Sequence, residues 1–254
     1  MKKKRLGYIL LGIIGIIAII GFALSSPIEQ NEDYHNFSDT LTIGGIPNFW
    51  NVISNFPFLI VGLFGIIRLK KMNRVNFQFS TFFIGISFVA IGSGYYHLNP
   101  NSSTLVWDRL PMTIVFTALM SIVISEFIDF KKGKLLLIPL LLIGIISIIY
   151  WVKLDDLRLY ALVQYYPILA IPIILVLFKS EENSPKGFWL LLITYIIAKL
   201  FETFDFEIHK TLKLLSGHSL KHISASVGIY LLIYSYIRQN KTIEKQLPTK
   251  PKLH

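Results

Sequence analysis

Long apolar runs follow one another along the whole chain, and they constrain the fold more than any other feature. Each is long enough to span, or nearly to span, a hydrocarbon core about 30 Å thick. Only helices and closed barrels satisfy their backbone groups in lipid, and barrel strands alternate polar and apolar residues. Because these runs are continuous, we predict an all-α, polytopic membrane helical bundle. The runs cover residues 8–24, 49–67, 77–96, 111–128, 135–152, 159–178, 187–204 and 220–237.

The composition agrees with this fold, since 53% of the residues are hydrophobic and only 16% are charged, against about 25% charged in soluble domains. We therefore expect a seven-helix core behind an N-terminal hydrophobic anchor or signal segment. The expected parts are an anchor or signal (1–25), an extracytoplasmic segment (26–48), the seven-helix core (49–238) and a disordered cytoplasmic tail (239–254).

The first run has a basic start, MKKKR, and small residues near its end, as a signal peptide has. Its apolar part is longer than the usual core of a signal peptide, so we favour a retained anchor over a cleaved signal.

The net charge of +10 comes mainly from Lys and Arg between the spans. Alternate connections are rich in these residues, and the positive-inside rule places them, with both termini, in the cytoplasm. We interpret the basic residues as contacts with anionic membrane lipids and expect no nucleic-acid partner. A basic anchor and the absence of Cys suit a bacterial inner membrane; in a eukaryote the endoplasmic reticulum or Golgi would fit.

Polar residues of the types found in catalytic and metal-binding sites lie together on the predicted outer face. The motif GSGYYH ends the second core span and places Ser93 and His97 one helical turn apart. Pro111 suits the first turn of the third core span, which would leave Asp108 just upstream of that helix. The last span opens with His218 and His222, again one turn apart.

Histidines at positions i and i+4 of a helix can bind one zinc ion, although HSLKH lacks the Glu of the H-E-x-x-H motif. Three histidines would leave one position open, as in catalytic zinc sites, and Asp108 is our candidate for the proton-handling carboxylate. Each residue also has a simpler explanation. The histidines could be interfacial residues, Asp108 could favour a helix N-terminus, and Ser93 could allow close helix packing.

Two further polar groups lie within spans. Lys199, Glu202, Asp205 and His209 form one stripe, which either lines the site or pairs internally. The second group, in the first core span, is explained by hydrogen bonds between helices, and we do not assign it to the site; it consists of Asn48, Asn51, Ser54 and Asn55.

Three sequence blocks resemble the alkaline ceramidases, members of a superfamily of seven-helix membrane hydrolases that includes progestin and adiponectin receptor relatives. The blocks are FWNVISN, GSGYYHLNPNSSTLVWDRLPM and GHSLKH, and the resemblance covers residues 34–237. It implies a zinc-dependent intramembrane amidase that cleaves ceramide or a related N-acyl lipid into a fatty acid and an amine such as a sphingoid base. It places the zinc on His97, His218 and His222. Ser93 would support the attacking water or the oxyanion, and Asp108 would be the acid/base.

The sequence departs from the animal enzymes in two places. Their acidic calcium-binding segment corresponds here to YHNFSDTLTIGGIPN, in which Asp39 is the single carboxylate, so calcium is doubtful. The HSLKH spacer also lacks the Trp of the animal pattern. The resemblance therefore supports the metal site more strongly than it supports the exact lipid substrate. Two other functions stay open: a receptor or sensor with a non-catalytic zinc, and a transporter that uses the Lys199 to His209 stripe.

Overall fold

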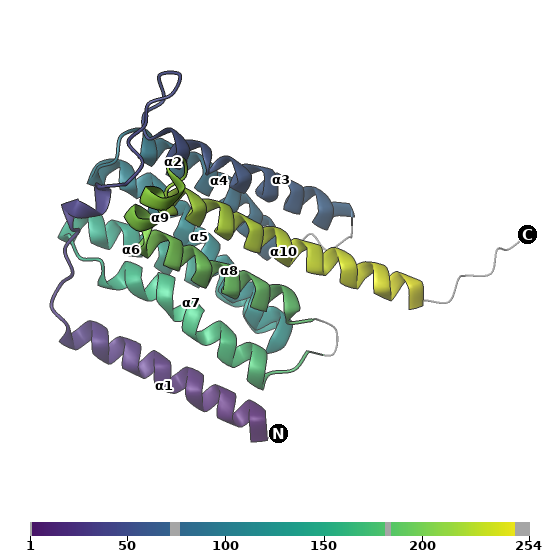
Figure 1. The fold of residues 1–254 in the computed structure, drawn as a ribbon. Helices are drawn as coiled ribbons and strands as arrows, with labels where there is room; N and C mark the ends of the chain where they lie inside the picture. The colour runs from purple at the N-terminus through teal and green to yellow at the C-terminus, as the bar shows by residue number, and fades with distance from the viewer. Residues whose placement is uncertain (1, 72–76, 181–183, 247–254) are drawn as a thin grey trace, which may run out of the picture.

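The computed structural model describes residues 2–71, 77–180 and 184–246, and nearly all of the regular structure in them is helical (Figure 1). Over these ranges the single β-type pairing is the bridge between Ile43 and Ile46. The helices are α1 (Lys2–Leu24), η1 (Glu32–His35), α2 (Phe49–Ile53), α3 (Phe56–Lys71), α4 (Phe77–Leu98), α5 (Ser102–Phe127), α6 (Phe130–Leu154), α7 (Arg158–Leu177), α8 (Lys186–Thr203), α9 (Asp205–Leu212) and α10 (Gly217–Gln246). The all-α fold class is confirmed.

Among the described residues, seven helices are long and apolar enough to cross a membrane, or eight if the bent pair α8 and α9 counts as one span. The first is α1, and α2 with α3 forms the next, so seven helices follow the N-terminal apolar helix when the bent pair α8 and α9 is counted as one span. Many large apolar side chains point outward, as a lipid-facing surface requires. These helices indicate a multi-pass membrane protein.

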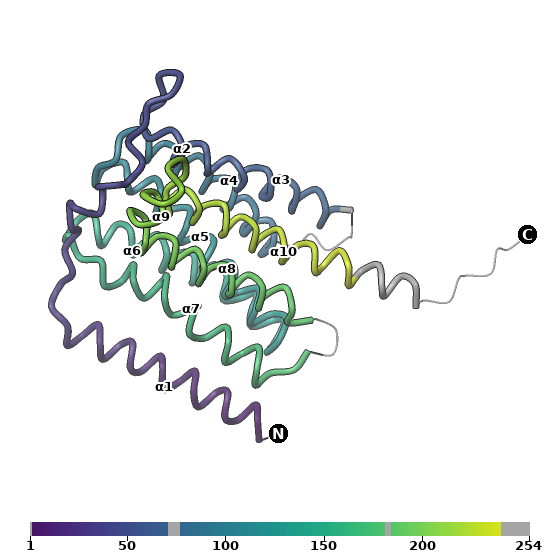
Figure 2. The backbone as a smooth tube through the Cα atoms, viewed as in Figure 1, coloured from purple at the N-terminus to yellow at the C-terminus, as the bar shows by residue number. Residues whose placement is uncertain are grey.

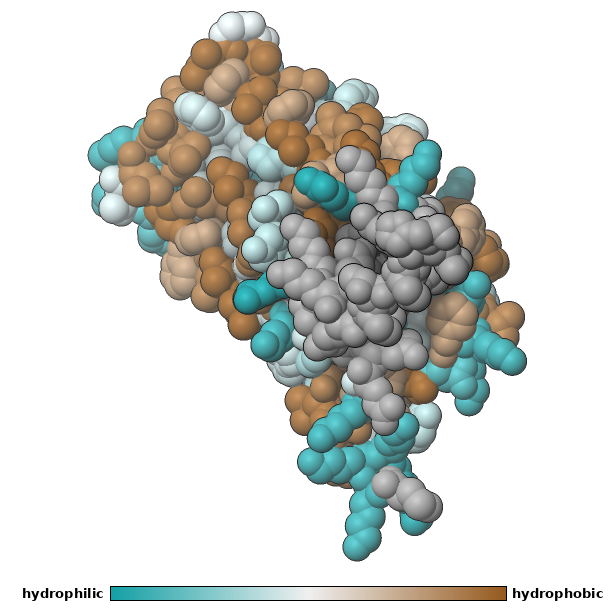
Figure 3. Space-filling model, turned by 90° about the vertical axis from the view of Figure 1, so that its right-hand side faces the viewer, coloured by the Kyte–Doolittle hydropathy of each residue, from teal (hydrophilic) through white to brown (hydrophobic). Residues whose placement is uncertain are grey.

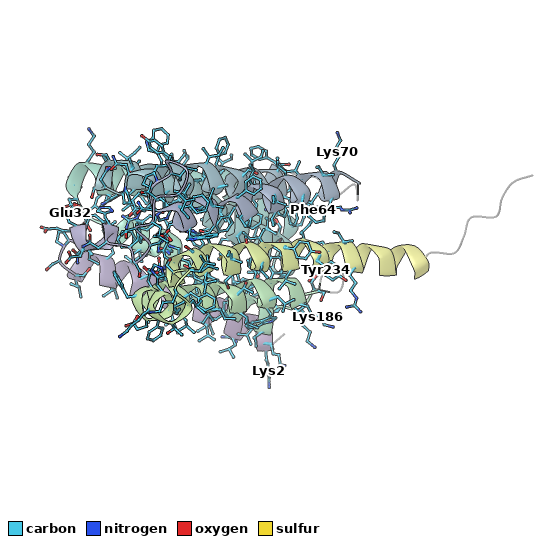
Figure 4. The ribbon with its side chains drawn as sticks, turned by 45° about the horizontal axis from the view of Figure 1, so that its top comes forward. Lys2, Glu32, Phe64, Lys70, Lys186 and Tyr234 are labelled. Carbon is cyan, nitrogen blue, oxygen red and sulfur yellow. The ribbon has the colours of Figure 1, made fainter. Side chains whose placement is uncertain are left out.

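The two ends of the bundle differ in charge. Lys2, Lys70 and Lys186 lie at one end, and Glu32 lies at the other (Figure 4). Figure 3 faces the lysine end, where hydrophilic side chains surround the grey atoms and apolar residues cover much of the visible flanks. We call the opposite end, with Glu32, the site end.

The chain from residue 25 to residue 48 crosses the site end, from α1 at one edge of the bundle to α2 (Figure 2). Its start is fixed to the loop between α6 and α7, where Leu157 N donates to Ile28 O at 2.8 Å and Ile28 N donates to the Asp156 carboxylate at 3.3 Å. The Arg158 guanidinium, 2.6 Å from Asp156, holds the pKa of that carboxyl well below its usual range. The segment is therefore held against the bundle.

Helix α5 begins at Ser102, so the prediction that it opens at Pro111 was wrong. Asn101 caps the helix by accepting hydrogen bonds from the backbone N–H groups of Ser103 and Thr104, and the Thr104 hydroxyl accepts from Asn101 N at 3.2 Å. This capping box starts the helix earlier than the apolar run suggests. Asp108 consequently lies inside the helix and not upstream of it.

Pro111 inside α5 leaves the carbonyl of Trp107 without its helical donor. Helix α4 packs against this carbonyl with Gly92, where an added Cβ would lie 2.0 Å from the Trp107 oxygen. The glycine thus allows the backbones to approach closely, as small residues do between membrane helices. The contact places Ser93 beside Asp108.

Helix α10 runs on to Gln246, so the segment expected to be a disordered tail from residue 239 is helical over its first part. The rest of that predicted tail, residues 247–254, lies outside the described residues.

Candidate metal centre and cavity

The three predicted ligands converge at the site end of the bundle. His97 lies in the last turn of α4, and His218 and His222 lie in the first turns of α10. All three are buried, and one ring nitrogen of each lies within 4.8 Å of the others. The three histidines could therefore hold one metal ion.

The spacing of two of the ligands suits a tetrahedral ion. Zinc–nitrogen bonds of about 2.0 to 2.1 Å place two imidazole ligands about 3.3 Å apart. The Nε2 atoms of His97 and His218 are 3.2 Å apart. Phe37, from the segment that crosses the site end, covers both rings, with centroid distances of 4.8 and 4.3 Å. The cluster is thus compact and buried.

Ser54 orients the third ligand. Its hydroxyl lies 2.8 Å from Nδ1 of His222, which leaves Nε2 of that ring for a metal. Metal-bound histidines usually hold their second nitrogen in such a hydrogen bond. Sequence reasoning had placed Ser54 outside the site, because nothing in the local pattern links it to a histidine 168 residues away.

Two asparagines of the same group hold the helices around the cluster. The side chain of Asn48 donates to the carbonyl of His97 at 2.9 Å, and Asn51 accepts hydrogen bonds from the hydroxyls of Ser216 and Ser219. The predicted hydrogen bonds between segments are therefore present, and they fix the backbone beside two of the ligands.

The polar stripe divides between two roles. Its second half, Asp205 and His209, holds the segments beside the histidines. The Asp205 carboxylate accepts hydrogen bonds from the backbone N–H groups of His218 at 2.7 Å and of Ser38 at 2.9 Å, and His209 contacts Ser38. Asp205 thus caps the start of α10, the helix that carries two of the histidines.

The inner half of the stripe forms an ion-pair network with a residue of the GHSLKH motif. Glu202 pairs with Lys199 at 2.5 Å and with Lys221 at 2.8 Å, and Lys221 lies 3.2 Å from Nε2 of His218. All three charged residues also line the cavity described next. The two alternatives for the stripe, internal pairing and lining the site, therefore both hold.

Ser93, Asp108 and His222 share the wall of a cavity of about 460 Å³. Ser93 and Asp108 are both buried, and their side chains interact with each other. Most of the remaining lining is apolar, and it includes Phe58, Phe82, Ile86, Val89, Met112, Val115, Phe116 and Ile229. A carboxylate, a hydroxyl and a candidate metal ligand thus lie beside a space suited to an apolar chain.

Fold and site together define a multi-pass helical membrane protein with a buried three-histidine cluster, one member of which, His222, lines a largely apolar cavity. Residues 42–252 match the sequence profile of the Ceramidase family, and the chain belongs to that family. A comparison with curated proteins finds no match. The match begins after α1 and includes all three histidines, Ser93 and Asp108.

Proposed function

We propose that the protein is a zinc-dependent intramembrane hydrolase that cleaves the amide bond of ceramide or a related N-acyl lipid. The products would be a fatty acid and an amine such as a sphingoid base. The main support is that Ser93, Asp108 and His222 line the same largely apolar cavity. Membership of the Ceramidase family supports the reaction class.

Zinc would be held by His97, His218 and His222, whose nitrogen donors and spacing suit it. When bound, zinc acts as a Lewis acid that polarises a carbonyl group and lowers the pKa of water.

The residues of the chain supply binding and proton transfer. The apolar wall binds the acyl chain and excludes water from around it. The Asp108 carboxylate takes a proton from the attacking water and returns one to the departing amine as the C–N bond breaks. The Ser93 hydroxyl orients Asp108 and is placed to stabilise negative charge on the carbonyl oxygen.

The test is fatty-acid release, measured by mass spectrometry, from a panel of ceramides and other N-acyl lipids. Wild type would be compared with Asp108→Asn and with Glu207→Gln, a control on the exposed surface of α9. We expect release by wild type and the control, and a loss of about 100-fold or more in Asp108→Asn at unchanged zinc content.

Undiminished release by Asp108→Asn would exclude this residue as the acid/base. If no lipid in the panel were cleaved by zinc-loaded wild type, a receptor or sensor with a non-catalytic zinc would become the better proposal.

A further inference from the structure

Arg109, next to the proposed acid/base, is a buried cation that forms no ion pair with any residue that the structure describes. Its side chain is among the buried polar groups, with 5% of the residue exposed. Over the described part of the chain, no residue forms an ion pair with Arg109 or accepts a hydrogen bond from it, and its buried Nη1 atom is unpaired. The other carboxylates that line the cavity, Glu29 and Glu202, lie beyond ion-pair distance, and Glu202 is engaged by two lysines.

Aromatic rings surround this guanidinium. Its central carbon lies over the rings of Trp151, Tyr160 and Tyr34, at 4.4, 4.9 and 5.2 Å from their centroids. Ring faces attract a cation, but they provide no acceptor matched to the five N–H donors of a guanidinium. Those donors form a planar fork that fits the oxygens of a carboxylate or a phosphate. The rings therefore hold the cation in place, and its hydrogen-bonding capacity is unused.

Arg109 also lines the cavity, at its polar end. The residues that follow it along α5 and line the same cavity are apolar, beginning with Met112 and Val115, whereas the polar residues Gln30 and Asn31 line it as well. Gln30 provides a second unpaired polar atom, since its buried Oε1 has no donor. An unpaired donor group and an unpaired acceptor thus line the cavity where a lipid head group would lie.

We propose that Arg109 binds an anionic oxygen group, a carboxylate or a phosphate, on the amine portion of the lipid amide. This inference rests on the proposed hydrolase function and narrows its substrate class to acidic N-acyl lipids. The acyl chain would occupy the apolar part of the cavity, the amide would lie at Asp108, and the acidic group would lie one residue further round α5, at Arg109.

Matched lipid pairs can test this. N-oleoylglycine and N-oleoylethanolamine share an acyl chain and differ in a carboxylate against a hydroxyl; ceramide 1-phosphate and ceramide differ in a phosphate. We expect wild type to favour the acidic member of at least one pair by about tenfold or more in kcat/KM, and the favoured pair identifies the anionic group.

Arg109→Gln should remove the preference, mainly by raising KM for the acidic lipid about tenfold, with the neutral lipid changed less than about threefold. Arg109→Lys should keep part of the preference for the acidic lipid, because Lys keeps the positive charge but lacks the planar set of N–H donors of a guanidinium. Arg68→Gln is the control, since Arg68 also lies over a ring, that of Phe64, but is exposed and does not line the cavity.

Binding separates this inference from the proposed function. Retention of N-oleoylglycine or ceramide 1-phosphate by purified Asp108→Asn protein should fall when Arg109→Gln is added, whether or not wild type cleaves any amide. Equal binding and cleavage of acidic and neutral lipids by wild type, or an equal loss for both in Arg109→Gln, would show that Arg109 is structural and would overturn the inference.

Discussion

At the scale of single residues, the candidate metal centre depends on side chains that never contact the metal position. Ser54 fixes the ring of His222, Asp205 holds the backbone of His218, and Asn48 holds the carbonyl of His97. Each ligand is therefore supported by a polar group from another element. Losing such a supporting group commonly lowers metal affinity or activity by about 10- to 100-fold.

Ser54→Ala should therefore weaken zinc binding by about 10- to 100-fold while leaving the fold intact. The hydroxyl that fixes the tautomer and orientation of His222 would be lost. Zinc affinity can be measured by competition with a coloured chelator, with Ser226→Ala as the control. Ser226 is buried in the same helix as His222, but its hydroxyl bonds to the carbonyl of Ile223. Equal affinities in the two variants would contradict a role for Ser54 in orienting His222.

The sequence allowed the histidines to be predicted because two of them repeat at one helical turn and the third ends a polar motif. Ser54 and Asp205 could not be assigned in the same way. Their partners lie 168 and 13 residues away, and the contacts exist only once α2, α9 and α10 meet. Arg109 carried no signal at all, since its lack of an ion pair with any described residue is a property of the folded chain.

At the scale of helices, the apolar runs predicted the spans well, but local polar interactions decided where the helices begin. The cap of α5 at Asn101 lies before the apolar run and moves the start of the helix by several residues. The chain bends by 80° between α8 and α9, in the middle of the polar stripe, and α9 was not predicted as a separate helix. Hydropathy describes the part of a helix in lipid, whereas caps and bends are set by particular side chains.

The GSG motif of α4 provides a test at this scale. The Gly92→Ala side chain would collide with the Trp107 carbonyl, because a Cβ added at Gly92 lies 2.0 Å from that oxygen. A Cβ added at Gly94 meets nothing within 4 Å. Gly92→Ala should therefore push α4 away from α5, separate Ser93 from Asp108, and lower both the melting temperature and lipid hydrolysis.

Gly94→Ala is the matched control and should keep or slightly raise stability, because Ala favours a helix by about 1 kcal/mol over Gly. Thermal unfolding in detergent and fatty-acid release would be measured for both variants. Similar behaviour of the two would show that the close contact between α4 and α5 does not position the site.

At the scale of the whole molecule, the candidate site and several lysines lie at opposite ends of the bundle. Lys2, Lys70 and Lys186 lie at one end, and Glu32 lies at the other (Figure 4). The histidine cluster lies at the same end as Glu32. A lipid amide could thus place its polar group near the interface at the site end while its chain stays at membrane depth. The orientation of the bundle in the membrane therefore determines which leaflet would provide the substrate.

The positive-inside rule predicts that the lysine end is cytoplasmic and that the site faces the opposite compartment. The chain contains no Cys, so single cysteines can report the orientation without background. Glu32→Cys and Lys186→Cys replace exposed residues at opposite ends.

In intact cells that express the protein in their inner membrane, a maleimide that cannot cross this membrane should label Glu32→Cys, and should label Lys186→Cys only after the membrane is opened. Wild type should stay unlabelled throughout. The reverse pattern would place the cavity mouth in the cytoplasm and the substrate in the cytoplasmic leaflet, because the site and Glu32 lie at the same end of the bundle.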